Sequence, residues 1–223
     1  MTPCIEVNHL SKTYSGQEIL RDVSLIVGSG STVGLVGANG SGKSVLFKAI
    51  CGFVRPDSGS VKVGGVTLGE HSDFPENIGV FINSPGFIGI YSGFKNLQFL
   101  ASIRGVITDE QIREAMRKVG LDPANKAKVD NYSLGMKQKL GLAQAIMEDQ
   151  EILVLDEPFN ALDFKTYNDV KEIIRTLQSE GKTILLTSHN YEDLDQLCDE
   201  VYIIDDGAVV PVTEDLIARY FSR

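Results

Sequence analysis

The sequence predicts an α/β fold with a largely parallel sheet. Short, continuous apolar runs, which are typical of strands covered on both faces, alternate along the chain with segments of helical periodicity. The length of 223 residues is sufficient for a sizeable core in one domain with a subdomain. We therefore expect a single domain over residues 1–223 with this sheet at its centre.

The first part of the chain contains two kinds of strand pattern. Segments 3–10, 18–27 and 60–68 have the character of shorter strands and predict an accessory antiparallel sheet. Residues 32–36, TVGLV, predict a buried strand, and residues 44–50, SVLFKAI, predict the helix that follows it. A glycine-containing loop joins this strand to this helix.

Residues 84–150 have a different pattern, in which helical periodicity is not interrupted by strand-like runs. Thr108 and Gln111 have the spacing of a capping box at the start of a helix. One apolar helix face follows, made by Ile112, Ala115, Met116 and Val119. We therefore expect a helical subdomain over about 84–150, inserted into a core formed by about 1–83 and 151–223.

The last part of the chain returns to the alternation of strand and helix. Residues 151–155 and 183–187 are short apolar runs that predict two buried strands. Between them, apolar residues recur at i, i+3, i+4 and i+7, at Val170, Ile173, Ile174 and Leu177. Gly181 follows as a stop signal, so the segment predicts an amphipathic crossover helix.

Charge and hydropathy exclude several classes of protein. The net charge of −9 leaves no general basic surface for nucleic acid, so we expect no nucleic-acid partner. The N-terminus has no basic region followed by an apolar run, which predicts no signal peptide. The uncharged stretch 77–94 contains Pro85 and several glycines, which disfavour a membrane span. We therefore expect a soluble protein.

Residues 37–44, GANGSGKS, fit the phosphate-binding pattern G-x-x-x-x-G-K-[ST] between a predicted strand and a predicted helix. The loop consists of Gly37, Ala38, Asn39, Gly40, Ser41, Gly42, Lys43 and Ser44. Its backbone N–H groups close around phosphates, and the helix N-terminus favours negative charge there. Lys43 is expected to reach the β- and γ-phosphates, and the Ser44 hydroxyl to bind Mg²⁺.

Acidic residues follow the second buried strand in ILVLDEP, residues 152–158. Asp156 is placed to hold Mg²⁺ directly or through water, and Glu157 to orient or deprotonate the attacking water. The alternative is that the two acids only end a strand and solvate a loop. His189 ends the next strand in TSH, where a γ-phosphate contact is expected, although a lone histidine is usually structural.

The segment YSLGMKQ, residues 132–138, followed by ILVLDEPFNALD and then TSH, resembles the ATP-binding-cassette (ABC) ATPases, specifically the nucleotide-binding subunits of transporters. The resemblance runs from about Ile5 to Val210. It implies a P-loop NTPase (RecA-like) core with an accessory antiparallel β-subdomain and an inserted α-helical signature subdomain. It also implies a head-to-tail homodimer, in which Ser133 and Gly135 contact the γ-phosphate bound by Lys43 of the partner subunit.

Other family features map onto single positions. Tyr14 matches the aromatic residue that stacks on adenine, although it is also compatible with an ordinary tyrosine at a strand end. Val45 stands where threonine is common, but its backbone N–H remains available. Residues 160–163, NALD, match the loop that meets its symmetry mate between the two sites.

The chain also departs from the family pattern, which usually reads Leu-Ser-Gly-Gly-Gln in the signature. Three of those five positions differ here, at Tyr132, Leu134 and Met136. Asn83 occupies the place of a glutamine that contacts Mg²⁺ and water. Asparagine is one methylene shorter, so we expect it to reach the metal through a bridging water.

The resemblance implies a separate integral-membrane permease that holds the chain at the cytoplasmic, inner face of the membrane. The uncharged residues 85–94 offer an apolar contact for this permease or, alternatively, pack inside the helical subdomain. The form YSLGM resembles exporters of peptide antibiotics, lantibiotic immunity and multidrug type. Two alternatives are a soluble ABC protein of translation or DNA repair and a regulatory nucleotide-binding module. A single cassette with an acidic balance disfavours the first, and the intact Lys43, Asp156, Glu157 and His189 disfavour the second.

Overall fold

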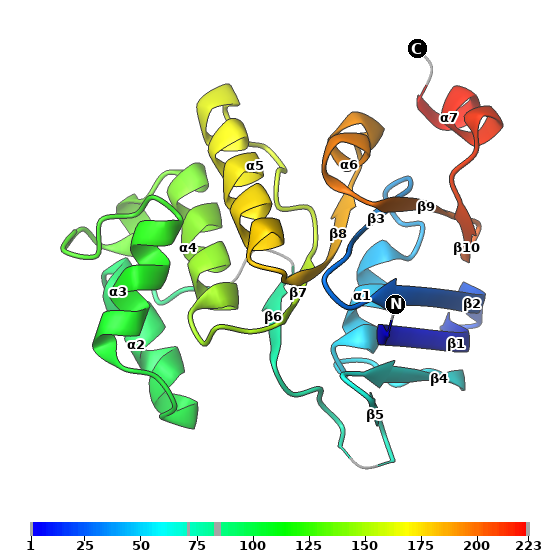
Figure 1. Cartoon of the computed structure of the whole chain (residues 1–223), viewed down its shortest axis with the longest axis horizontal. Coiled ribbons are helices and arrows are strands. Elements are labelled where there is room, and N and C mark those ends of the chain that lie inside the picture. The colour runs from blue at the N-terminus through cyan, green and yellow to red at the C-terminus, as the bar shows by residue number, and fades with distance from the viewer. Residues whose placement is uncertain (1, 71, 83–85, 222–223) are drawn as a thin grey trace.

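The computed structural model describes residues 2–70, 72–82 and 86–221. Its centre is a sheet with the strand order β10-β9-β3-β8-β7-β6 (Figure 1). The strands are β3 (Thr32–Val36), β6 (Ile78–Phe81), β7 (Ile152–Leu155), β8 (Thr183–Ser188), β9 (Glu200–Asp205) and β10 (Ala208–Pro211). Neighbouring strands are parallel except β10, which pairs antiparallel with β9. The predicted α/β fold with a largely parallel sheet is therefore confirmed.

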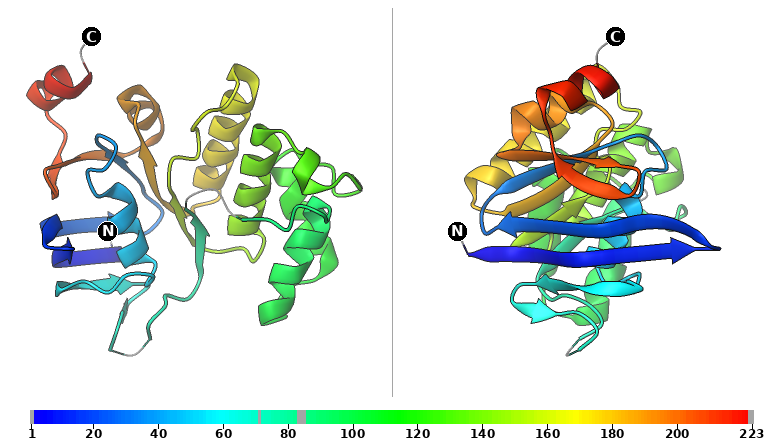
Figure 2. Two further views of the ribbon diagram at one scale, coloured as in Figure 1. Left: turned by 180° about the vertical axis from the view of Figure 1, so that it is seen from behind. Right: turned by 90° about the vertical axis from the view of Figure 1, so that its right-hand side faces the viewer.

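A smaller antiparallel sheet lies at one end of the molecule, opposite the helices of residues 93–146 at the other end (Figures 1 and 2). Its order is β2-β1-β4-β5. The strands are β1 (Pro3–Tyr14), β2 (Gln17–Gly28), β4 (Ser58–Val63) and β5 (Val66–Thr67). The single strand expected over 60–68 is wrong, because Gly64 and Gly65 both have positive φ angles, 58° and 84°, and form a turn that divides it.

The central strands separate two hydrophobic cores. Every residue of β3, β7 and β8 is buried, because helices or the second sheet cover both faces. Along β7, Leu153 and Leu155 pack in one core and Val154 packs in the other. The second core also contains α1 (Lys43–Ile50), which lies between the two sheets in Figure 1. This double covering holds the carboxyl ends of the strands in fixed positions.

The opposite face of the central sheet carries two helices, α5 (Phe164–Ser179) and α6 (Tyr191–Leu197). The crossover helix predicted around 170–177 is confirmed within α5, and Gly181 follows its end with a φ of 78°. A short helix, α7 (Glu214–Phe221), follows β10.

The region expected to be helical contains α2 (Gly93–Arg104), α3 (Asp109–Lys118), the 3-10 helix η1 (Val129–Asn131) and α4 (Leu134–Ile146). The capping box predicted at Thr108 and Gln111 is present, and its helix buries Ile112, Ala115 and Met116. Residues of the uncharged stretch divide between the two expected environments. Phe87 and Phe94 pack against the core, whereas Ile88, Ile90 and Tyr91 are exposed. Throughout residues 2–70, 72–82 and 86–221, no helix is long and apolar enough to cross a membrane.

Candidate nucleotide site

The phosphate-type loop lies where β3 ends and α1 begins. Gly42 precedes the helix with a φ of 109°, a conformation that side chains disfavour. A Cβ atom on Gly37 would lie 2.6 Å from Cγ2 of Ile204 and 2.8 Å from Oγ of Ser41. Glycine at these positions lets the loop backbone curl closely over the end of the sheet.

Lys43 turns back into this loop. Its side chain is buried, and Nζ donates hydrogen bonds to the carbonyl oxygens of Gly37 at 2.7 Å and Ala38 at 3.2 Å. The same ammonium lies 3.7 Å from Oε1 of Glu157. The positive charge therefore lies at the centre of the loop and faces the carboxyl end of β7.

Asp156 is held by two hydroxyl groups. Ser44 Oγ donates to Oδ2 of Asp156 at 2.7 Å, and Thr187 Oγ1 donates to Oδ1 at 2.8 Å. The carboxylate is buried, so both oxygens have fixed directions. The backbone N–H of Glu157 also donates to Thr187 Oγ1, at 2.8 Å. Thr187 orients both acids, a role that the sequence did not predict, although a hydroxyl directly follows the aliphatic residues 184–186 of this strand.

Glu157 and His189 face each other across the ends of β7 and β8. His189 Nδ1 lies 2.9 Å from Oε2 of Glu157. Glu157 has a φ of 52°, an uncommon left-handed conformation for a residue with a side chain. Its other oxygen, Oε1, is buried and makes no hydrogen bond within the described part of the chain. A buried acceptor of this kind is costly unless a ligand or water satisfies it.

A pocket of about 310 Å³ opens over this arrangement. It is lined by Tyr14, Ile19, Asn39, Gly40, Gly42, Lys43, Ser44, Val45 and Glu157. A second hollow of about 240 Å³ adjoins it at Ser44 and Glu157 and is bounded by Asp156, Leu134, Gln138, Asn160 and Ala161. The structure thus brings Tyr14 to the loop. The predicted site residue Asn83 lies outside the described residues.

Ser133 and Gly135 lie at the start of α4, outside the described lining of both hollows. Ser133 is exposed and caps the helix, since its Oγ accepts the backbone N–H of Met136 at 3.2 Å. Gly135 is buried, and a Cβ atom there would lie 2.6 Å from Cγ2 of Thr166 on α5. Among the residues of this segment, Leu134 and Gln138 line the second hollow, whereas Ser133 and Gly135 line neither.

Comparison with known proteins assigns the chain to a family. The family model described as ABC transporter matches residues 20–160. An uncharacterized ABC transporter ATP-binding protein, YybJ of Bacillus subtilis (strain 168), is 40% identical over 87% of this chain and 89% of its own length. The bacitracin transport ATP-binding protein BcrA of Enterococcus faecalis is 34% identical over 92% of this chain and 68% of its own. The lantibiotic transport ATP-binding protein SrtF of Streptococcus pyogenes is 32% identical over 92% and 89%.

Solved structures of ABC transporter subunits have the same fold as this chain. The ATP-binding subunit of an ABC transporter superposes with a TM-score of 0.83 at 28% identity, over 98% of this chain and 93% of that one. A dimeric bacterial ABC transporter cassette has the same fold, with a TM-score of 0.81 at 22% identity, over 92% and 96%. The chain therefore belongs to the ABC transporter family, as an ATP-binding subunit whose ATPase activity drives transport.

Proposed function

We propose that this chain hydrolyses ATP at the Lys43–Glu157–His189 arrangement, in a site that a second copy of the chain completes. The observation that carries the proposal is the geometry of Glu157. One of its carboxylate oxygens contacts His189, while the other is buried, makes no hydrogen bond within the described residues and lies 3.7 Å from Lys43 Nζ. This is the arrangement that a base needs beside a phosphate-binding lysine.

ATP binding is assigned to the loop and to Tyr14. Backbone N–H groups of residues 37–45 surround the phosphates, and Lys43 exchanges its two loop carbonyls for β- and γ-phosphate oxygens. Tyr14 is 44% exposed at the edge of the pocket, with Lys12 Nζ 5.4 Å from the centroid of its ring, and we assign this ring to stacking on adenine.

The residues present fit Mg²⁺. Ser44 and Asp156 offer oxygen donors of the type that Mg²⁺ prefers, already 2.7 Å apart. No group of three or more His, Cys, Asp or Glu side chains suited to a metal occurs among the described residues, which accords with a metal bound mainly by phosphate and water. When bound, the metal neutralises charge on the β- and γ-phosphates.

Hydrolysis then follows from the position of Glu157. Its Oε1 accepts a proton from water, whose oxygen bonds to the γ-phosphorus as the bond to the bridging oxygen of ADP breaks. His189 holds the carboxylate through Oε2 and lies beside the γ-phosphate. Phosphoryl transfer of this kind depends mainly on positioning and on charge stabilisation, which Lys43 supplies.

The dimer proposal explains the location of the YSLGMKQ segment. Ser133 is exposed at the N-terminus of α4, a position that favours an anion from another molecule. Asn160 and Ala161 are exposed beside the site, as a loop that meets its symmetry mate requires. We therefore assign Ser133 and Gly135 to the γ-phosphate held by Lys43 of the partner subunit.

Transport requires a membrane partner, and exposed apolar residues near α2 offer a surface for it. Ile88, Ile90, Tyr91, Phe99 and Ile103 are all exposed in this region. We assign them to contact with a separate integral-membrane permease, which holds the chain at the cytoplasmic face. The names of the bacitracin and lantibiotic relatives favour export of a peptide antibiotic or a similar compound.

The transport proposal is tested by identifying the neighbouring open reading frame and, where it encodes a multi-span membrane protein, co-expressing that protein with the chain. We expect the two to co-purify in detergent, and ATP-dependent export of labelled peptide antibiotic from cells or proteoliposomes that contain both. Ile90→Glu with Ile103→Glu should reduce the recovered complex by at least about tenfold, because charges replace apolar contacts in the interface. The control is Ile26→Glu, an exposed isoleucine on β2. Equal recovery of all three proteins would contradict the assigned surface.

A further inference from the structure

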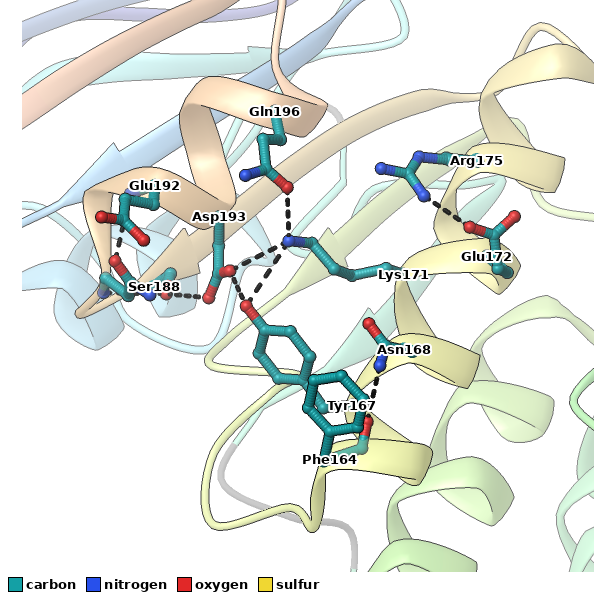
Figure 3. Close-up of polar contacts among 11 residues, drawn as sticks. Phe164, Tyr167, Asn168, Lys171, Glu172, Arg175, Ser188, Glu192, Asp193 and Gln196 are labelled. Carbon is teal, nitrogen blue, oxygen red and sulfur yellow. Dashed lines mark hydrogen bonds and ion pairs between the residues drawn. The ribbon is translucent and has the colours of Figure 1, made fainter.

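A buried polar cluster joins α5 to α6 beside the proposed site (Figure 3). We call it the α5–α6 cluster, and it comprises Tyr167, Lys171, Ser188, Asp193 and Gln196. Lys171 and Asp193 are only 7% and 3% exposed. Lys171 Nζ lies 3.2 Å from Oδ1 of Asp193 and donates to Oε1 of Gln196 at 2.8 Å. The hydroxyl of Tyr167 donates to the same Oδ1 of Asp193.

The cluster reaches the turn that carries His189. Oδ2 of Asp193 lies 3.5 Å from Ser188 Oγ, which in turn accepts the backbone N–H of Asn190 at 3.0 Å. Ser188 and Asn190 are the two neighbours of His189 in the chain. The backbone on both sides of the histidine is thus tied to one hydroxyl, and Asp193 faces that hydroxyl.

The cluster also reaches the segment that follows Glu157. The ring of Tyr167 packs against Phe159, with ring centroids 5.6 Å apart. The backbone N–H of Tyr167 donates to the carbonyl of Asp163, and Asp163 caps α5 by accepting the N–H of Thr166. Tyr167 therefore connects Asp163, at the end of the loop 160–163, to Asp193, which in turn lies beside Ser188, the residue before His189.

Stability alone does not account for these buried charges. Burial, together with the negative charge of Glu157, raises the pKa of Asp193 to about 6. Burial also lowers the pKa of Lys171, with a contribution from the positive charge of Arg175. Apolar side chains of similar volume often replace a buried ion pair without loss of stability. The contacts of the cluster with the turn that carries His189 instead support a role in positioning that turn.

We propose that the α5–α6 cluster positions His189 against Glu157 and couples it to the loop 160–163 that faces the partner subunit. Asp193 acts through Ser188 and does not itself touch substrate. Tyr167 and Lys171 link α5 to α6, so that a movement of one helix shifts the other. This inference rests on the proposed roles of Glu157 and His189.

The test replaces the buried pair with Lys171→Met and Asp193→Leu together, which keeps the volume and leaves no unpaired charge. We expect a folded protein whose kcat for ATP hydrolysis is about tenfold lower, with KM for ATP within about twofold, because the catalytic groups are misplaced while the phosphate loop is intact. The matched control is Glu172→Leu with Arg175→Met, an exposed ion pair on the same helix that Figure 3 also shows. It should retain the wild-type kcat.

A double-mutant cycle identifies the route of the effect. In a His189→Ala background, the Lys171→Met/Asp193→Leu pair should lower kcat no further, because its action passes through His189. A multiplicative loss in that background, or a wild-type kcat in the folded double variant, would overturn the inference. If the double variant does not fold, Tyr167→Phe takes its place in the same cycle.

Two further variants keep this inference separate from the proposed function. His189→Ala and Glu157→Gln alone should each lower the rate. If neither does, the proposed site is wrong; if both do and the cluster variants do not, only the positioning role of the cluster fails.

Discussion

Glu157→Gln is expected to bind ATP as the wild type does and to hydrolyse it at least about a hundredfold more slowly, which is the scale of a lost general base. The amide fits the same space and retains the contact with His189, but it does not accept the proton of the attacking water. Binding is unaffected because the phosphates are held by the loop and Lys43. The measurement is phosphate release under saturating Mg-ATP, together with ATP titration by calorimetry.

A matched control flanks the same strand at its other end. Glu151 is exposed at the opposite end of β7, so Glu151→Gln makes the same chemical change away from the site. It should hydrolyse ATP at the wild-type rate. Near-normal turnover by Glu157→Gln would reject Glu157 as the base.

Ser133→Arg should abolish dimerisation in the presence of ATP and leave ATP binding by the monomer nearly intact. We expect this in the Glu157→Gln background, where bound ATP persists and holds two copies together. The arginine fits the monomer because Ser133 is exposed, but it fills the space that a γ-phosphate of the partner subunit would occupy. Light scattering with and without ATP measures the change.

Loss of the helix cap is a separate effect of this substitution and costs about 1 kcal/mol. Ser92→Arg controls for it, since Ser92 caps α2 through the backbone N–H of Lys95. That variant should still dimerise with ATP. An unchanged ATP-dependent dimer in Ser133→Arg would refute the shared site.

Periodicity and local chemistry predicted the strands and helices that hold the site. The buried runs at β3, β7 and β8 are continuous in the sequence, and the capping box at Thr108 is a local pattern of four residues. Motifs of this kind need no knowledge of distant contacts. The division of 60–68 into two strands was missed because the two glycines act through positive φ angles, which the apolar pattern does not reveal.

Contacts between distant segments could not be read from the sequence. The interaction of Thr187 with both Asp156 and Glu157 joins residues about thirty positions apart, across neighbouring strands. Lys171 and Asp193 are 22 positions apart and meet only because α5 and α6 pack side by side. Neither pair has a spacing signal, since the packing of elements and not the local pattern sets the distance.

The most direct test of the shared site mixes two inactive variants, Glu157→Gln and Ser133→Ala, before ATP is added. Each alone is expected to be nearly inactive, because every site in its dimer lacks either the base or the partner hydroxyl. In a mixed dimer, one site combines the intact Glu157 of one copy with the intact Ser133 of the other. An equimolar mixture should therefore recover about a quarter of the wild-type rate, since random pairing makes half of the dimers mixed and each has one intact site of two. A mixture whose rate equals the average of the two variants measured separately would contradict a site shared between two copies of this chain.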